Sequence, residues 1–306
     1  MRDRPTGDAA LLLLADSRLP AGGHAHSGGA EEAVRLGTIT GPEDLARFLR
    51  GRLATAGLVS AALAAAACEF AAATADHPAG PYGHAGPDPN AADLNATPNP
   101  GRAPAPAPAQ DTEPAQNTNP ASALDADPAS APDTDPEPAT DPARLWRRLD
   151  AEADARTASP AQREASRVQG RLLIRSARRI WPSAVLDELA RAVPEGAHHP
   201  VALGAAAAAA GCDPYQAALA AAYNSVTGPA TAAVRLLGLD PVTVHRLLAD
   251  LAPALNDAAH AACASLIDDV VPTGGSGWPA LPGHTAPALD LLAEGHLDNP
   301  MKLFVS

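Results

Sequence analysis

Paired histidines are the residues of this chain whose type and spacing come nearest to metal chemistry. His24 and His26 are separated by one residue, and His198 and His199 are adjacent. Imidazole nitrogen is a good ligand for nickel and related metals. Neither pair has a nearby cysteine or a tight group of acidic residues to complete a set of four ligands. The sequence therefore predicts no resident metal site.

A serine beside a histidine is the second feature that could do chemistry. Ser27, His26 and Asp16 are the best candidates for a nucleophile, a base and an orienting carboxylate. Adjacent residues on a helix point in different directions, and the chain has no Gly-x-Ser-x-Gly elbow. Glu31 and Glu32 are interpreted as surface carboxylates near a helix start. We therefore expect no catalytic residue, no cofactor and no enzymatic activity.

The remaining charged and sulfur-containing residues exclude several classes of protein. Lys302 is the single lysine, and no glycine-rich loop precedes it, so the chain is not a P-loop GTPase. The net charge of −13 argues against nucleic-acid binding. Cys68, Cys212 and Cys263 are far apart and odd in number, which suits a reducing compartment such as the cytoplasm. No convincing membrane span is present.

The elements that must position these residues are predicted to be helices. Alanine and leucine are abundant and aromatic residues make up only 3%, which favours an all-α bundle of about eight to ten helices. Helices are expected to begin at Pro42, Pro160 and Pro214. Gly57 is expected to separate two helices, and Pro229 to kink or end another. One long helix is expected over residues 241–266.

A segment of different composition, residues 76–142, interrupts this helical body. It holds 16 of the 32 prolines, with eleven acidic residues against one basic residue. Such a composition cannot bury enough apolar surface to offset its ordering entropy, so it predicts a disordered insert. The helical domain is then residues 1–75 and 143–306. Without the insert the net charge is about −3, so most of the acidity belongs to the insert.

The segment from Leu14 to Glu31 is the most informative motif. An apolar run stops at Asp16 and Ser17, Pro20 and a Gly-Gly pair break the helix, and Ser27 could cap the next one. The string Leu-Ala-Asp-Ser-Arg-Leu-Pro-Ala-Gly-Gly-His-Ala-His-Ser-Gly-Gly-Ala-Glu resembles the opening of the urease accessory protein F (UreF) family. His24 replaces a usual aromatic residue, and Ala30 a usual leucine.

Later blocks resemble the same family in the same order. They are Arg163–Ser166 with Gly170–Leu173, His199–Gly204, Ala232–Leu236 and the C-terminal Lys302–Ser306. Asp240-Pro241 stands where the family has Gly-Gln, and Lys302 replaces an arginine. Lysine keeps the charge but loses the bidentate fork of arginine.

The resemblance implies a non-catalytic accessory protein for nickel urease. Such a protein assembles with the urease accessory protein D (also called H), recruits the nickel-carrying GTPase accessory protein G, and docks on apo-urease as a homodimer. From the net charge and the lack of a convincing membrane span we expect no nucleic-acid or membrane partner. The alternatives are a regulator of the partner GTPase and a nickel-binding chaperone.

Partner-binding residues are expected in the family-like blocks. The C-terminal tail and the turn after Asp16 are the main expected surfaces, with an exposed Phe304 ordered by a partner. The candidates are Asp16, Ser17, Pro20, Gly22, Gly23, His26, Ser27, Glu31, Arg163, Ser166, Gly170, Tyr223, Arg235, His296, Lys302, Leu303 and Phe304.

Overall fold

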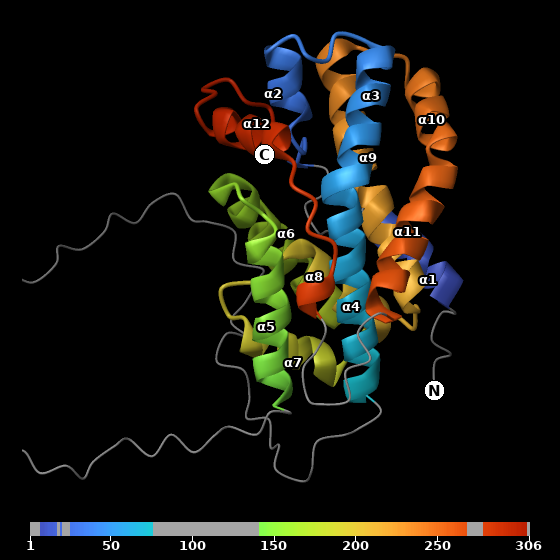
Figure 1. Cartoon of the computed structure of the whole chain (residues 1–306), viewed down its shortest axis with the longest axis vertical. Helices are drawn as coiled ribbons and strands as arrows, with labels where there is room; N and C mark the ends of the chain where they lie inside the picture. Colours follow the sequence, from blue (N-terminus) through green and yellow to red (C-terminus); the bar gives the residue numbers. More distant parts are fainter. Residues whose placement is uncertain (1–6, 17–18, 20–24, 76–140, 268–277, 305–306) are drawn as a thin grey trace, which may run out of the picture. The chain divides into compact units, whose positions relative to one another are not determined.

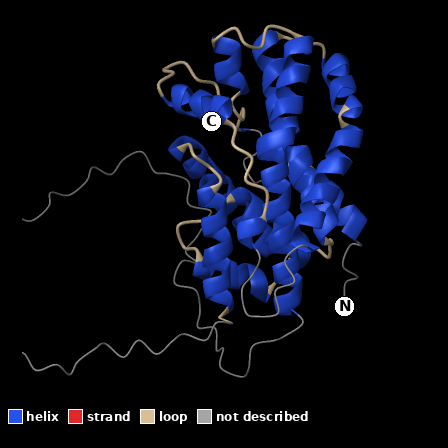
Figure 2. Ribbon diagram, viewed as in Figure 1, coloured by secondary structure: helices blue, strands red, loops and turns tan. Residues whose placement is uncertain are grey.

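The chain is helical wherever its structure is described. A computed structural model describes residues 7–16, 19, 25–75, 141–267 and 278–304. These residues form helices, turns and loops and contain no β-strand (Figure 2). The prediction of an all-α fold is confirmed.

Contacts between Cα atoms divide the chain into two units. Residues 1–78 with 137–306 form the first unit, and residues 79–136 form the second. Every helix described here belongs to the first unit. The predicted insert lies outside the described residues except for its last two, Asp141 and Pro142, which cap and begin a helix.

Figure 1 shows the helices of the described residues. In chain order they are α1 (Gly7–Ala15), α2 (Ala30–Arg35), α3 (Pro42–Arg52), the π turn η2 (Leu53–Gly57), α4 (Leu58–Ala75), α5 (Pro142–Ala155), α6 (Pro160–Ile180), α7 (Ala184–Ala192), α8 (His199–Ala209), α9 (Pro214–Leu237), α10 (Pro241–Asp250), α11 (Ala252–Ile267), the 3-10 turn η3 (Trp278–Ala280) and α12 (Pro287–Leu297).

The expected helix starts are confirmed, and each has a local cause. Proline lies in the first turn of α3, α6 and α9, where its missing N–H is not needed. The Ser159 hydroxyl accepts the N–H of Gln162. Asp213 and Gln216 form a reciprocal capping box at α9.

The predicted break at Gly57 is wrong. α3 runs through the π turn η2 into α4 as one continuous helix over residues 42–75. Gly57 is buried, and a Cβ there would lie 2.8 Å from Ser225 Oγ, so the glycine permits close packing of α9. This helix is long and apolar enough to cross a membrane, but 61% of its most apolar window is buried, as in a core helix.

Two further expectations about helix ends are corrected. α9 does not end at Pro229 but continues to Leu237. The expected helix over residues 241–266 is divided at Leu251 into α10 and α11. Pro253 lies in the first turn of α11, where it cannot donate a backbone hydrogen bond to the preceding helix.

The core is built from alanines where α4 packs against α8, α9 and α11. Every residue of α4 from Ala61 to Cys68 is buried. A Cβ on Gly204 of α8 would lie only 2.2 Å from the carbonyl oxygen of Ala64. The backbones of the two helices therefore approach each other closely, which is possible only because small residues face each other.

Candidate partner-binding junction

The carboxylate of Glu31 holds the C-terminal tail. Its Oε1 accepts the N–H of Leu303 at 2.6 Å, and its Oε2 accepts the N–H of Phe304 at 3.1 Å. Figure 1 shows α12 and the C-terminus beside α2, although these segments lie at opposite ends of the sequence. Charge-assisted hydrogen bonds thus fix a chain end that would otherwise fray. We call residues 25–35, Arg52, residues 225–229 and residues 287–304 the junction.

His296 of α12 completes this attachment of the tail. It is 1% exposed, and its Nε2 lies 3.2 Å from the carbonyl oxygen of Phe304. A carbonyl only accepts, so Nε2 must carry the proton in this contact. The other ring nitrogen, Nδ1, lies 3.6 Å from Glu31 Oε2. The imidazole therefore sits between the tail carbonyl and the carboxylate that holds the tail.

The interpretation of Glu31 and Glu32 as surface carboxylates is wrong. Their side chains are 5% and 2% exposed. Arg35 donates from Nε to Glu32 Oε2 at 2.7 Å, and this hydrogen bond lowers the pKa of Glu32. Burial opposes the shift, while the charges of Arg35 and His296 reinforce it. Glu31 and Glu32 are thus both buried, and both accept hydrogen bonds from other groups of this chain.

Arg52 connects the N-terminal motif to α9. Pro229 has no N–H, so the carbonyl of Ser225, four residues earlier, lacks its helical donor. Arg52 Nε donates to that carbonyl at 2.8 Å, and Nη1 donates to the carbonyl of Gly28 at 2.8 Å. Burial lowers the pKa of Arg52 to about 10. The arginine therefore supplies the hydrogen bond that the proline removes.

The turn before α2 differs from its predicted form. Ser27 does not cap the helix, because Gly29, with a φ of 89°, is the N-cap residue. Within the described residues the buried Ser27 hydroxyl has no hydrogen-bond partner, so it makes no bond to His26. Asp16 lies on the surface. Ser27, His26 and Asp16 therefore do not assemble as a nucleophile, base and orienter.

α12 is fastened to the start of α6 by two carboxylates. Glu294 accepts the Ser159 hydroxyl and the N–H of Ala161, and these bonds lower the pKa of Glu294. Asp290 accepts the N–H of Ser159 and the amide of Gln162, both at 3.3 Å. Negative side chains at a helix N-terminus are favoured by the helix dipole. The position of α12 is thus set by α2 on one side and by α6 on the other.

The candidate residues of α6 have internal partners. Arg163 donates to the carbonyl of Thr157 at 2.8 Å, and the Ser166 hydroxyl accepts the N–H of His199 at 3.0 Å. A Cβ on Gly170 would lie 1.8 Å from the carbonyl oxygen of Ala197. A hydrogen bond within the chain therefore accounts for the serine at position 166, and close packing accounts for the glycine at position 170. A partner-binding role for either residue stays a prediction.

The other candidate residues divide by exposure. Phe304 is 7% exposed, so the expectation of an exposed Phe304 is wrong, whereas Leu303 is 75% exposed. Lys302, Tyr223 and Arg235 are also exposed. The candidates that lie outside the described residues are Ser17, Pro20, Gly22 and Gly23, together with His24 of the first histidine pair.

The second histidine pair is divided between two sites. The backbone N–H of His198 donates to Asp150, and its Nε2 lies 2.9 Å from Asp154. Asp150, Asp154 and His198 are close enough together to hold a metal ion. However, the guanidinium of Arg167 contacts both carboxylates, at 2.9 and 2.6 Å, and already supplies the positive charge. The arrangement is an ion-pair network between α5 and α6.

His199 has a different environment from His198. Burial, reinforced by the charge of His26, lowers the pKa of His199 to about 4. The cysteine thiols are also protonated, because burial raises the pKa of Cys68 to about 12 and that of Cys212 to about 11. A neutral thiol is a poor metal ligand.

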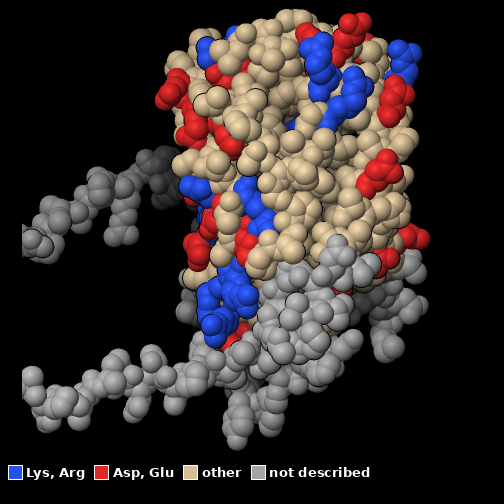
Figure 3. All heavy atoms as spheres, in the orientation of Figure 1, with Lys and Arg blue, Asp and Glu red and all other residues tan. Residues whose placement is uncertain are grey.

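An apolar surface covers the outside of α12 and the tail. Four aliphatic side chains are exposed there by 53–84%: Leu291, Leu297, Met301 and Leu303. Figure 3 shows acidic side chains as well as uncharged ones at the place of these elements. Large apolar side chains that stay exposed are candidates for contact with a partner. We call these four residues the apolar surface of the junction.

Comparison with known proteins assigns the chain to a family. A sequence model of the UreF family matches residues 121–252. The urease accessory protein UreF of Mycobacterium sp. (strain JLS) is 37% identical over 296 residues, which cover 97% of each chain. The protein of the same name from Mycolicibacterium vanbaalenii is 36% identical over 298 residues, 97% of this chain and 98% of that one. This chain belongs to the UreF family. UreF of Mycobacterium tuberculosis is 34% identical over 301 residues, 98% of this chain and all of that one.

Some residues of this UreF-family junction were missed by reasoning from sequence. Arg52 lies in an ordinary amphipathic helix, and nothing local distinguishes it from Arg50. The one available signal was indirect, because Pro229 inside a helix implies an unpaired carbonyl four residues earlier. Glu32 gave no sign of its burial, and His296, although predicted as a partner-binding residue, was not expected to be buried.

Proposed function

We propose that this chain is a urease maturation protein that acts without catalysis as a scaffold for nickel insertion. In this proposal it bridges the accessory D/H protein and the accessory G GTPase on apo-urease, as a homodimer in the cytoplasm. Membership of the UreF family, whose relatives carry the name urease accessory protein, supports the maturation role. The structural observation that carries the scaffold role is the tail held by Glu31.

The C-terminal tail is held by its backbone N–H groups, which leaves its side chains free for other contacts. Glu31 binds the N–H groups of Leu303 and Phe304, and Phe304 turns inward while Leu303 points to solvent. A tail that is already ordered loses less conformational entropy when a partner binds. We therefore assign the apolar surface of the junction to the accessory D/H protein.

Aspartate substitutions on this surface test the assignment. Leu291→Asp combined with Leu303→Asp should abolish copurification with the accessory D/H protein, because both charges would be buried without partners. Both side chains are at least 74% exposed, so the far-ultraviolet circular-dichroism spectrum should not change. Val242→Asp, on α10 at 76% exposure, is the matched control and should copurify normally. Normal copurification of the double variant would refute the assignment.

A second measurement separates the scaffold from the regulator. GTP hydrolysis by the accessory G protein should be unchanged when this chain is added alone, and nickel-dependent urease activation should still require it. A large change in GTP hydrolysis without the other partners would favour the regulator alternative instead.

A further inference from the structure

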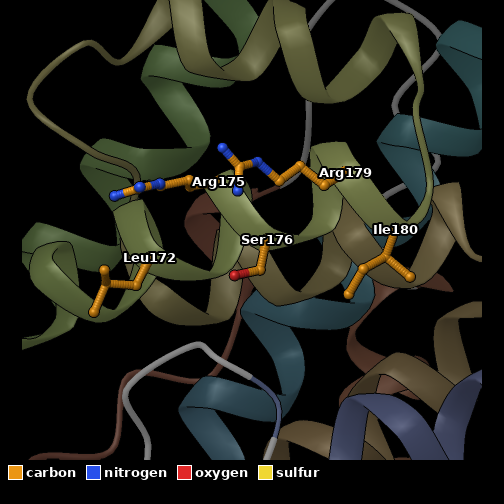
Figure 4. A pocket seen from close by; sticks show the side chains of 5 residues that line it. All are labelled: Leu172, Arg175, Ser176, Arg179 and Ile180. Carbon is orange, nitrogen blue, oxygen red and sulfur yellow. The ribbon is translucent and has the colours of Figure 1, made fainter. Parts of the chain in front are cut away.

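An arginine-rich face of α6 lines an open hollow that the junction does not use. Five described residues line this hollow of about 360 Å³: Leu172, Arg175, Ser176, Arg179 and Ile180. Figure 4 shows Leu172, Ser176 and Ile180 in one row along the helix and the two arginines in a second row beside it. Both rows follow the four-residue spacing of a helix face. We call these five residues the α6 groove.

Among the described residues, no carboxylate neutralises the positive charge of the α6 groove. Arg171 pairs with Glu164 at 3.3 Å, and Arg178 pairs with Asp187 at 2.6 Å. No carboxylate in the described part of the chain lies within ion-pair distance of Arg175 or Arg179. Two guanidinium groups without an ion pair to any described residue therefore stand beside each other in a chain of net charge −13.

Apolar side chains flank these two charges. Leu172 is 36% exposed and Ile180 is 46% exposed, one at each end of the groove. They lie eight residues apart, so the groove is about 12 Å long at the helical rise. Arg175 also lines a second hollow of about 150 Å³ between α6 and α7. The two arginines thus lie between apolar ends along two helical turns.

We propose that the α6 groove docks an acidic amphipathic segment of a protein partner. Carboxylates of that segment pair with Arg175 and Arg179, and an apolar side chain packs on Leu172 and Ile180. A short helix presents both features at the same spacing as the groove. A nucleic acid is a poor match, because the overall negative charge repels it. This surface is distinct from the apolar surface of the junction and does not rest on the proposed function.

Charge reversal in the full-length chain tests the proposal. The probe is a fluorescein-labelled helical peptide with leucine on one face and glutamate beside it, followed by fluorescence anisotropy. Arg175→Glu combined with Arg179→Glu should weaken binding about tenfold and flatten its salt dependence. Leu172→Ala combined with Ile180→Ala should weaken binding without changing the salt dependence.

The matched control lies on α5. Arg144 and Arg148 are also exposed, four residues apart and without an ion pair in the described part of the chain. Figure 3 shows basic side chains gathered over α5. Arg144→Glu combined with Arg148→Glu should leave peptide affinity within about twofold, since rim charges act weakly. An equal loss in both arginine variants would overturn the proposal, because net charge alone would then explain binding.

Two other results would also overturn it. Inorganic phosphate that displaces the peptide at millimolar concentration, more strongly than chloride at equal ionic strength, would indicate a simple anion site. Peptide binding that appears only after residues 77–140 are replaced by a short Gly-Ser linker would assign the groove to the chain's own acidic segment. Equal binding with and without that segment would support a partner in trans.

Discussion

The alanine core around α4 and the junction around Glu31 are both buried, but different forces hold them together. In the core, α8 approaches α4 so closely that a Cβ on Gly204 would strike the Ala64 carbonyl. In the junction, directed hydrogen bonds from Arg52 and to Glu31 join segments that lie far apart in the sequence. The core is therefore sensitive to added atoms, and the junction to lost donors and acceptors.

The largest effect should come from adding one methyl group to the core. Gly204→Ala should lower the free energy of unfolding by about 3 kcal/mol, because backbone atoms of α4 cannot move aside. Urea denaturation followed by circular dichroism measures this change. Gly51→Ala is the control: Gly51 is exposed on α3 with nothing near its missing Cβ, so the same change should add about 0.5 kcal/mol. Similar stabilities of the two variants would disprove the close approach of α8.

Removing the donors of Arg52 should have the next largest effect. Arg52→Met keeps most of the side-chain volume but leaves the carbonyls of Ser225 and Gly28 unpaired, which should cost about 2 kcal/mol. Arg50→Met, two residues away on the exposed side of α3, should change stability by less than about 0.5 kcal/mol. If the two variants unfold at the same urea concentration, Arg52 does not stabilise the junction.

The pH dependence of stability should report on His199. Its pKa is lowered to about 4 in the folded chain, against an ordinary value of 6.5. Between these values the unfolded chain binds a proton that the folded chain does not, so stability is full above pH 6.5 and falls toward pH 4. The slope should be at most about 1.4 kcal/mol per pH unit.

Two histidine variants identify the source of that slope. Thermal unfolding from pH 4 to 7 should show a weaker dependence in His199→Gln than in the unaltered chain. His245→Gln, on the exposed side of α10, should keep the full dependence. An unchanged slope in His199→Gln would mean that another group titrates.

The smallest effect is expected at Lys302. Its side chain is exposed, and the tail is held through the N–H groups of the next two residues. Lys302→Ala should therefore change stability by less than about 0.5 kcal/mol, and amide hydrogen exchange at Leu303 should stay slow. Glu31→Gln should speed that exchange. Rapid exchange in Lys302→Ala would show that the lysine itself positions the tail.

Local rules were sufficient for much of the helical body. The all-α class follows from alanine and leucine content, and the starts of α3, α6 and α9 follow from proline and capping residues. Gly57 does not separate two helices, and Pro229 does not end α9, for the same reason. A residue that breaks an isolated helix can stay inside a packed one, when a neighbouring helix fills the space or supplies the missing hydrogen bond.

The sequence by itself determined the helical class, the family-like blocks and the absence of a lysine-dependent phosphate loop. Only the tertiary structure decided that Glu31 binds the C-terminal tail, about 270 residues further along the chain. It also decided that Arg52 donates a hydrogen bond to the carbonyl of Ser225 on α9. The physical reason is the distance along the sequence over which each interaction acts. Propensity and capping act within a few residues, whereas a buried carboxylate or guanidinium pairs with whatever group the packing brings within 3 Å.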